Sequence, residues 1–352
     1  MDGKEKRENA VWAARHRGKS LILSLVMSIL AGSMSFGSDT MGGCEEAYTV
    51  TRRDKLFAVQ FVDTKTGFAV GNKGMLLKTA DRGVRWQKIA CGPERIESFN
   101  AVSFSGSSGW VVGGNGLILS TNDTGGTWQT QQSGTTETLI AVGALSATEA
   151  IAVGSAGTIL STADSGTTWK PADLDWMSIL PEEVIARGIT SPNLYDVFFA
   201  DAEHGWVVGD SGLVLGTADG GRSWKLLAMG TYPTLYSVWF RSAAEGYVCG
   251  QEACLLHTTD GGTTWEKLSV PPQAANVPLY RVRFNGPSGL IAGDRALILT
   301  SADEGASWQV LSAELPPPLP WFADLCIVSH NSPSQAIIVG QSLIKSISVP
   351  GK

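Results

Sequence analysis

The sequence lacks the residue patterns that usually mark a catalytic or metal-binding protein. It contains no Cys-x-x-Cys, no His-x-x-x-His and no Gly-x-Ser-x-Gly, so the common zinc, metalloprotease and hydrolase signatures are absent. Its four histidines are scattered along the chain, at His16, His204, His257 and His330. We therefore predict a protein that is not an enzyme and that uses no catalytic residue, no metal and no cofactor.

Long apolar runs are also scarce. The single run, Leu21 to Ala31, follows a basic region that contains Lys4, Arg15 and Lys19. It is too short to cross a bilayer, which takes about 20 apolar residues. Together with the small residues that follow, it predicts a Sec-type signal peptide over residues 1–38 and export of the rest. Two alternatives stay open for the N-terminus, an uncleaved anchor and a lipid on Cys44, and peripheral membrane association stays open as well.

Positive charge is in short supply as well. The chain has 27 Lys and Arg against 33 Asp and Glu, a net charge of −6. Nucleic acid is therefore not an expected partner, because its binding needs a clustered basic face. The five cysteines permit disulfides in an exported protein. We expect Cys249–Cys254, with Cys44–Cys91 as a second candidate and Cys326 unpaired.

Glycine and tryptophan are plentiful, with 41 and 12 residues, and both belong to a repeat. The motif Ser/Thr-x-Asp-x-Gly-x-x-Trp is clearest at residues 258–265. Its Asp accepts nearby backbone N–H groups, its Gly permits positive φ, and its Trp packs beneath the turn. Because this Asp-box turn recurs in every unit, we interpret it as structural. Its six copies contain Asp81, Asp123, Asp164, Asp219, Asp260 and Asp303, followed by Trp86, Trp128, Trp169, Trp224, Trp265 and Trp308.

Strand-like segments precede each Asp-box turn. In the fifth unit they are 235–240, 246–250 and 254–258, and a fourth strand starts at Trp265. Four antiparallel strands per unit make one propeller blade. A seventh unit, 322–348, lacks the turn and the fourth strand, so we expect a strand at 48–52 to complete it. The predicted fold is all-β: a seven-bladed propeller of four-stranded antiparallel blades over residues 45–350.

One insertion, Lys170 to Asn193, lengthens a single repeat and includes a candidate helix at 182–187. Insertions of this kind tend to lie on the binding face of a repeat protein. The insertion is apolar at Trp176, Met177, Ile179 and Leu180, which predicts either a partner contact or packing back onto a blade.

The complete repeat, best seen in 205–212 (GWVVGDSG) and 109–113 (GWVVG), resembles the photosystem II stability and assembly factor family. The likeness covers residues 48–348, and that family is related to the sialidase-like propellers with BNR (Asp-box) repeats. The resemblance implies an exported, chaperone-like scaffold that binds a membrane-protein client through an arginine-rich face. Its location would be periplasmic, or the thylakoid lumen in a photosynthetic host. Candidate arginines are Arg241, Arg281, Arg283 and Arg295.

The alternative function is that of a carbohydrate-binding or sialidase-like propeller. It would require facing carboxylates, or stacked exposed aromatic rings, around a central pocket. The chain has no Arg-Ile-Pro motif, which sialidases carry. Asp210, Glu252 and Asp294 share one predicted face, but their blades fan apart, so we interpret them as polar turn residues.

Overall fold

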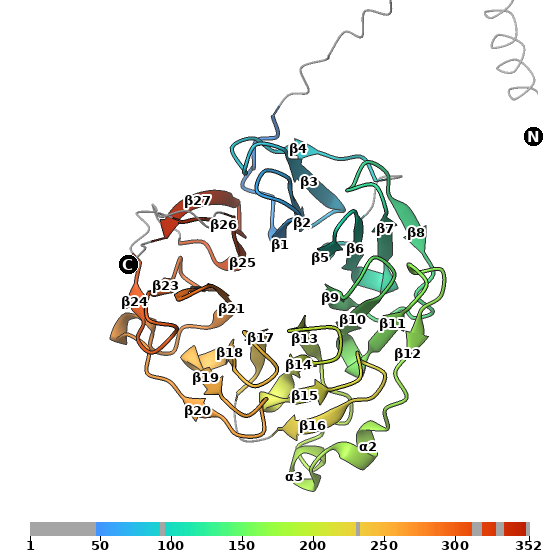
Figure 1. Cartoon of the computed structure of the whole chain (residues 1–352), viewed down its shortest axis with the longest axis vertical. Helices are drawn as coiled ribbons and strands as arrows, with labels where there is room; N and C mark the ends of the chain where they lie inside the picture. Colours follow the sequence, from blue (N-terminus) through green and yellow to red (C-terminus); the bar gives the residue numbers. More distant parts are fainter. Residues whose placement is uncertain (1–46, 92–95, 230–232, 312–318, 329–333, 350–352) are drawn as a thin grey trace, which may run out of the picture. The chain divides into compact units, whose positions relative to one another are not determined.

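The computed structural model describes residues 47–91, 96–229, 233–311, 319–328 and 334–349. Residues 45–352 form one compact unit. In this unit seven β-sheets are arranged in a ring around a central axis (Figure 1). The predicted signal peptide, residues 1–38, and Cys44 lie outside the described residues.

Six sheets have four antiparallel strands and the seventh has three, so the predicted seven-bladed propeller is confirmed. Blades 1 to 3 are β1 (Leu56–Phe61), β2 (Gly67–Gly71), β3 (Met75–Thr79), β4 (Gln87–Lys88); β5 (Phe99–Ser105), β6 (Ser108–Gly113), β7 (Ile118–Thr121), β8 (Gln129–Gln131); and β9 (Leu139–Ala144), β10 (Ala150–Gly154), β11 (Ile159–Thr162), β12 (Lys170–Pro171). Blades 4 and 5 are β13 (Leu194–Phe199), β14 (Gly205–Gly209), β15 (Val214–Thr217), β16 (Lys225–Ala228); and β17 (Leu235–Phe240), β18 (Gly246–Gly250), β19 (Leu255–Thr258), β20 (Glu266–Lys267). Blades 6 and 7 are β21 (Leu279–Asn285), β22 (Ser288–Gly293), β23 (Ile298–Ser301), β24 (Gln309–Val310); and β25 (Phe322–Ile327), β26 (Ser334–Gly340), β27 (Leu343–Val349).

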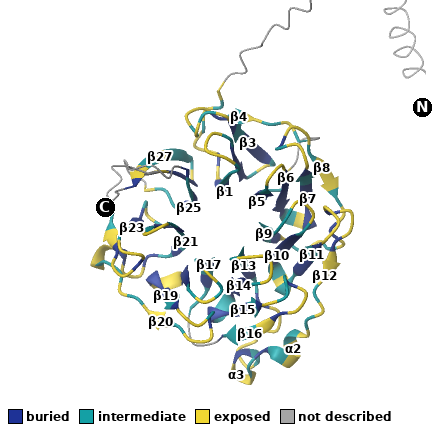
Figure 2. Ribbon diagram, in the orientation of Figure 1, coloured by how far each residue is buried: buried dark blue, intermediate teal, exposed yellow. Residues whose placement is uncertain are grey.

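The hydrophobic core lies between neighbouring blades. The second strands β14 and β18 are buried along their whole length, whereas the outer strand β20 is exposed (Figure 2). Between blades 4 and 5 the ring of Trp206 stacks on Phe240 with centroids 3.4 Å apart. Because every blade buries both of its faces against its neighbours, the ring stabilises each blade only when it is closed.

The Asp-box turns adopt the predicted local structure. In the fifth copy the Asp260 carboxylate accepts hydrogen bonds from Thr264 N (2.9 Å), Thr264 Oγ1 (2.7 Å) and Thr258 Oγ1 (2.8 Å). The backbone N–H of Thr264, and then the two hydroxyl groups, lower the pKa of Asp260 to about 2. In the sixth copy the buried Trp308 donates its indole N–H to Gly305 O, 3.0 Å away. These two boxes are closed by bonds within the turn, and Trp206 of blade 4 adds a hydrogen bond from its indole N–H to Gly261 O in the fifth box, 2.9 Å away.

The prediction of a fourth strand at Tyr48–Arg52 is wrong. The seventh sheet contains β25, β26 and β27 only, and residues 47–51 have no strand structure. The segment packs instead with Tyr48 and Val50 against the core between blades 1 and 7. A single bridge pair, Lys55 with Gln341, joins the two ends of the ring. Side-chain packing thus replaces strand pairing at the closure.

The predicted Cys249–Cys254 disulfide is also wrong. Both thiols are unpaired, because Cys249 on β18 and Cys254, which directly precedes β19, lie on opposite faces of blade 5. Cys249 lies in the core shared with blade 6, and Cys254 lies in the core shared with blade 4. Burial raises the pKa of Cys254 to about 11. In the described part of the chain Cys326 is unpaired too, as expected.

Candidate functional site

A β-bulge at the start of each inner strand turns one side chain away from its sheet. In β17 the register shifts between Leu235 and Ser237, so Tyr236 has no partner on β18. The second strand ends there in a glycine: a Cβ on Gly250 would collide with the carbonyl oxygen of Thr234. A bulge re-aims the side chain that it leaves out of register. The same shift recurs in all seven inner strands.

The seven bulged residues meet at one end of the central channel, which we call the mouth. They line a cavity of about 370 Å³ together with Arg281 and Trp321. The bulged residues are Phe57, Asn100, Ile140, Tyr195, Tyr236, Tyr280 and Ala323. All seven are half-buried, so the mouth is accessible and is aromatic over blades 4–7 and blade 1.

The aromatic rings of the mouth contact one another around its rim. Tyr195 and Tyr236 have ring centroids 5.4 Å apart, and Tyr236 and Tyr280 have theirs 5.5 Å apart. Phe57 stacks on Trp321 at 6.0 Å with the two planes nearly parallel. Stacked, exposed rings around a central pocket were what we required of a carbohydrate-binding propeller; here the rings are half-buried, and of these three pairs only Phe57 and Trp321 stack. In the sequence, the bulged residues are the second residue of each Leu/Phe-x-x-Val/Leu strand. The sequence prediction did not single out this position.

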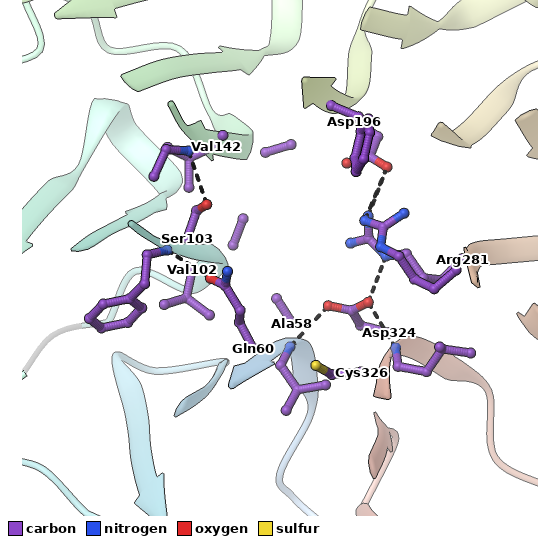
Figure 3. Close-up of a pocket in the computed structure, with 18 of the residues that line it drawn as sticks. Ala58, Gln60, Val102, Ser103, Val142, Asp196, Arg281, Asp324 and Cys326 are labelled. Atoms are coloured by element: carbon purple, nitrogen blue, oxygen red, sulfur yellow. Dashed lines mark hydrogen bonds and ion pairs between the residues drawn. The ribbon is translucent and has the colours of Figure 1, made fainter. Parts of the chain in front are cut away.

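An ion-paired cluster forms the floor of the mouth (Figure 3). Arg281 reaches from β21 to two carboxylates, with its Nη1 2.8 Å from Asp196 on β13 and its Nε 2.6 Å from Asp324 on β25. Asp196 also accepts from Val238 N on β17, and Asp324 from Val59 N on β1. Arg283 lies beside them, 3.7 Å from Asp196. Two cations and two carboxylates balance, so the floor carries no net charge.

Below the floor the channel continues as a second cavity of about 410 Å³. On the side of blades 1–3 its walls are joined by neutral side chains (Figure 3). Gln60 Oε1 accepts from Phe104 N at 2.8 Å, and Ser103 Oγ accepts from Ala144 N at 3.0 Å. The only acidic side chains that line this cavity are Asp196 and Asp324, and both face Arg281.

The turns between second and third strands lie on the mouth side of the ring. They hydrogen-bond to the links between blades, as in Gly116 N to Glu137 O and Ala253 N to Val277 O. Both therefore emerge on one face, which we call the mouth face; the Asp-box turns lie on the opposite face.

Exposed cations gather on the mouth face where blade 1 begins. Asn72 holds the segment that precedes β1 to blade 1, since its Oδ1 accepts a hydrogen bond from Lys55 N at 2.8 Å and its Nδ2 donates to Arg53 O at 3.1 Å. Lys73 follows on the same turn. We call this group the basic cluster; it comprises Arg52, Arg53, Lys55 and Lys73. None of the four has an ion-pair partner among the described residues.

The four predicted arginines do not form one patch. Arg281 and Arg283 lie together in the channel, tied to carboxylates. Arg241 lies on the Asp-box face, paired with Glu245 at 3.3 Å and Glu304 at 3.0 Å. Arg295 is exposed on the mouth face, in a turn with positive φ. Sequence reasoning missed the basic cluster, whose signal was the run Arg52, Arg53 and Lys55 followed by Lys73 on the next mouth-side turn.

The insertion forms two short helices, α2 (Trp176–Ile179) and α3 (Glu182–Ile185), at the outer edge of the ring (Figure 1). Leu180 is buried in the core between blades 3 and 4, and Trp176 and Ile179 pack against that core. Only Met177 of the four apolar candidates is exposed, at 54%. Packing back onto the blades is therefore what the structure shows for three of them. The insertion also lies across the ring from blade 1 (Figure 1) and so not beside the basic cluster.

The described ranges lack both a metal-binding cluster and a membrane-spanning helix. No three His, Cys, Asp or Glu side chains gather closely enough there to hold a metal ion. None of the helices there has the length and apolarity needed to cross a membrane.

The chain matches a known protein family over most of its length. A family model described as "Photosynthesis system II assembly factor YCF48" matches residues 45–175, 177–231 and 222–321, most of the chain. The protein belongs to the YCF48 family. No curated protein matches the chain in sequence.

Two YCF48 structures share the fold. One, described as "YCF48 bound to D1 peptide", is 21% identical, has a TM-score of 0.67, and the match covers 87% of this chain and 97% of that one. YCF48 from Cyanidioschyzon merolae is 19% identical with a TM-score of 0.65, covering 87% and 98%. A structure described as "Structure of U3-55K" is only 10% identical at a TM-score of 0.64, covering 82% of this chain and 89% of that one, so the fold extends beyond the YCF48 family.

Proposed function

We propose that this protein is an exported assembly factor of the YCF48 type that holds a segment of a membrane-protein client on the mouth face. The observation that carries the proposal is the aromatic mouth closed beneath by the Arg281 cluster. Aromatic rings supply large contact area at low conformational cost, and they dominate binding surfaces for that reason. The YCF48 structure bound to D1 peptide supports a peptide as the ligand class.

The basic cluster extends this site beyond the mouth. Lys55 precedes the mouth residue Phe57 by two residues, so a chain lying across Phe57 passes these cations. Exposed arginine and lysine side chains suit acidic groups of a partner, and Arg does so with a planar fork of donors. We infer that the cluster takes the part that the resemblance gives to an arginine-rich face.

The protein acts as a scaffold and not as an enzyme in this proposal. A glycosidase needs two carboxylates that face each other across a substrate. Here the two channel carboxylates, Asp196 and Asp324, share Arg281 between them. Their hydrogen bonds to backbone N–H groups of blades 5 and 1 give them a structural task, which is to hold the inner strands together.

The test is a binding assay with overlapping synthetic peptides that tile the D1 sequence, measured by fluorescence anisotropy. We expect a few neighbouring peptides to bind, and Tyr236→Ala with Tyr280→Ala to weaken them at least about ten-fold, since each ring supplies roughly 1–2 kcal/mol. Arg222→Ala, exposed on the Asp-box face, is the control and should bind like the unaltered protein. Absence of binding, or binding indifferent to the mouth variant, overturns the proposal.

Carbohydrate binding is a second candidate, because stacked aromatic rings around a pocket also suit sugars. A glycan array probed with the same protein separates the two functions. Glycan binding that the mouth variant abolishes, without any peptide binding, would favour this candidate.

A further inference from the structure

The mouth differs in charge from one side to the other. Over blades 4–6 its rim consists of three tyrosines, and the neighbouring turns carry Asp210, Glu252 and Asp294. Tyr195 donates its hydroxyl to Asp210 Oδ1 at 3.0 Å. The other donors to Asp210, the backbone and side-chain N–H groups of Asn193, are neutral. None of the three acids has an ion-pair partner in the described part of the chain.

The acidic side chains Asp210 and Asp294 affect the pKa values of the three tyrosines. Burial and then the charge of Asp210 raise the pKa of Tyr195 to about 12 and also raise that of Tyr236. Burial and then the charge of Asp294 raise the pKa of Tyr280. The one cation on these three turns is Arg295, so the turns carry three carboxylates and one guanidinium. The floor does not offset them, because Arg281 and Arg283 are balanced by Asp196 and Asp324.

Resting on the proposed function, we propose that the tyrosine side of the mouth is a subsite for a cationic side chain, Lys or Arg, of the bound client segment. The faces of aromatic rings attract cations, and nearby unpaired carboxylates strengthen that attraction. The three rings, with centroids 5.4 and 5.5 Å apart, form the part of the wall over blades 4–6 of a cavity of about 370 Å³, which has room for a side chain. The basic cluster lies on the same face at blade 1. The client segment would therefore carry a basic residue at one end and acidic residues at the other.

The first experiment needs no client. The protein is titrated with N-acetyl-lysine methylamide, the arginine analogue, and the uncharged norleucine analogue, and tyrosine ring signals are followed by NMR. We expect both cationic probes to shift the signals of Tyr195, Tyr236 and Tyr280, and norleucine to bind at least about five-fold more weakly, as one cation–π contact implies. The ratio of the two cationic probes tells whether Lys or Arg is preferred. Equal binding of norleucine, or tighter binding of N-acetyl-glutamate methylamide, overturns the subsite.

Matched variants separate ring, charge and fold. Tyr236→Phe keeps the ring and should bind the lysine probe like the unaltered protein, whereas Tyr236→Leu should bind it several-fold more weakly. Asp210→Asn with Asp294→Asn should weaken the lysine probe and leave norleucine unchanged. Glu266→Gln, exposed on β20, is the charge control. Loss of norleucine and lysine binding together would indicate a collapsed mouth and contradict the assignment of charge.

The second experiment distinguishes this inference from the function on which it rests. In any D1 peptide that binds, each Lys or Arg is replaced by norleucine. If one replacement weakens binding to the unaltered protein but not to Asp210→Asn/Asp294→Asn, both proposals hold. Peptide binding that no such replacement affects keeps the proposed function and overturns the subsite. If no peptide binds while the lysine probe does, the proposed function fails and the subsite stands.

Discussion

The inner strands of blades 1–3 and of blades 4–7 meet the channel with different chemistry at the same position. Two residues after each strand begins, the first three blades carry alanine, whereas the other four carry a polar or charged residue. In chain order these residues are Ala58, Ala101, Ala141, Asp196, Ser237, Arg281 and Asp324.

Both halves solve the same problem, which is to tie each inner strand to the next blade. In blades 1–3 neutral groups do this, as when Asn100 Nδ2 donates to Leu139 O at 2.8 Å. In blades 4–7 a connected set of charges does it, with Arg281 reaching two blades at once. Each neutral hydrogen bond contributes to stability independently, whereas removing the central residue of a charged network leaves the other charges uncompensated. The charged half also lies beneath the tyrosine side of the mouth.

The largest expected effect comes from removing the central cation. Arg281→Met leaves Asp324 without its cation and leaves Asp196 with Arg283 alone, 3.7 Å away, so we expect a loss of about 4 kcal/mol in the free energy of unfolding. Urea denaturation measures it, with the exposed Arg222→Met as control. Adding Asp196→Asn and Asp324→Asn should restore much of the loss. A cost below about 1 kcal/mol would show that the two halves do not differ in kind.

The second-largest expected effect on stability is at the junction between blades 3 and 4. The insertion covers blades 3 and 4 there, and Leu180 is only 6% exposed. Leu180→Ser should cost about 3 kcal/mol through the lost apolar contact and the cavity left behind. Met177→Ser on the same helix pair should cost almost nothing in the same denaturation series. Equal costs at the two sites would mean that the insertion is not anchored as the structure has it.

A neutral tie of blades 1–3 should matter less. Ser103→Ala removes the acceptor for Ala144 N, and we expect a cost of about 1 kcal/mol. Since each neutral tie acts alone, Ser103→Ala combined with Gln60→Ala should be close to additive. Strong non-additivity in a double-mutant cycle would refute the contrast with the charged half.

The contribution of the Asp boxes to stability should become visible only in acid, in both halves of the ring. Hydrogen bonds from backbone N–H and hydroxyl groups lower the pKa of Asp164 and Asp260 to about 2, from an ordinary value of 3.8. A lowered pKa contributes stability that is complete above about pH 4 and is lost as the pH falls toward 2. The melting temperature should therefore stay level from pH 7 to 5 and fall below pH 4. A fall that starts near pH 6 would point to other groups.

The sequence predicted the repeating part of this molecule well, because a repeated turn and strand pattern specifies each blade locally. Asp260 and Trp308 lie where their motif indicated. The failures concern contacts between blades. Nothing local distinguishes a strand at 48–52 from a packed segment, and the alternation that separates Cys249 from Cys254 depends on which residues form the turn.

The mouth was missed for a related reason. Tyr195, Tyr236 and Tyr280 look like ordinary strand residues in their own repeats, and only the bulge and the closed ring bring them together. Arg281 and Arg283 were among the four candidate arginines, but their carboxylate partners come from blades 4 and 7. The residues Asp196 and Asp324 lie 128 positions apart in the chain, so no sequence spacing could join them.

Photo-crosslinking in the host cell tests most directly whether the client lies on the mouth face. A benzoylphenylalanine replaces Ile140, half-buried in the mouth, or Arg222, exposed on the Asp-box face. We predict that the probe at Ile140 captures a membrane-protein client, identified by mass spectrometry, and that the probe at Arg222 captures none. Capture of the same client from Arg222 alone would place the binding surface on the opposite face and contradict this account.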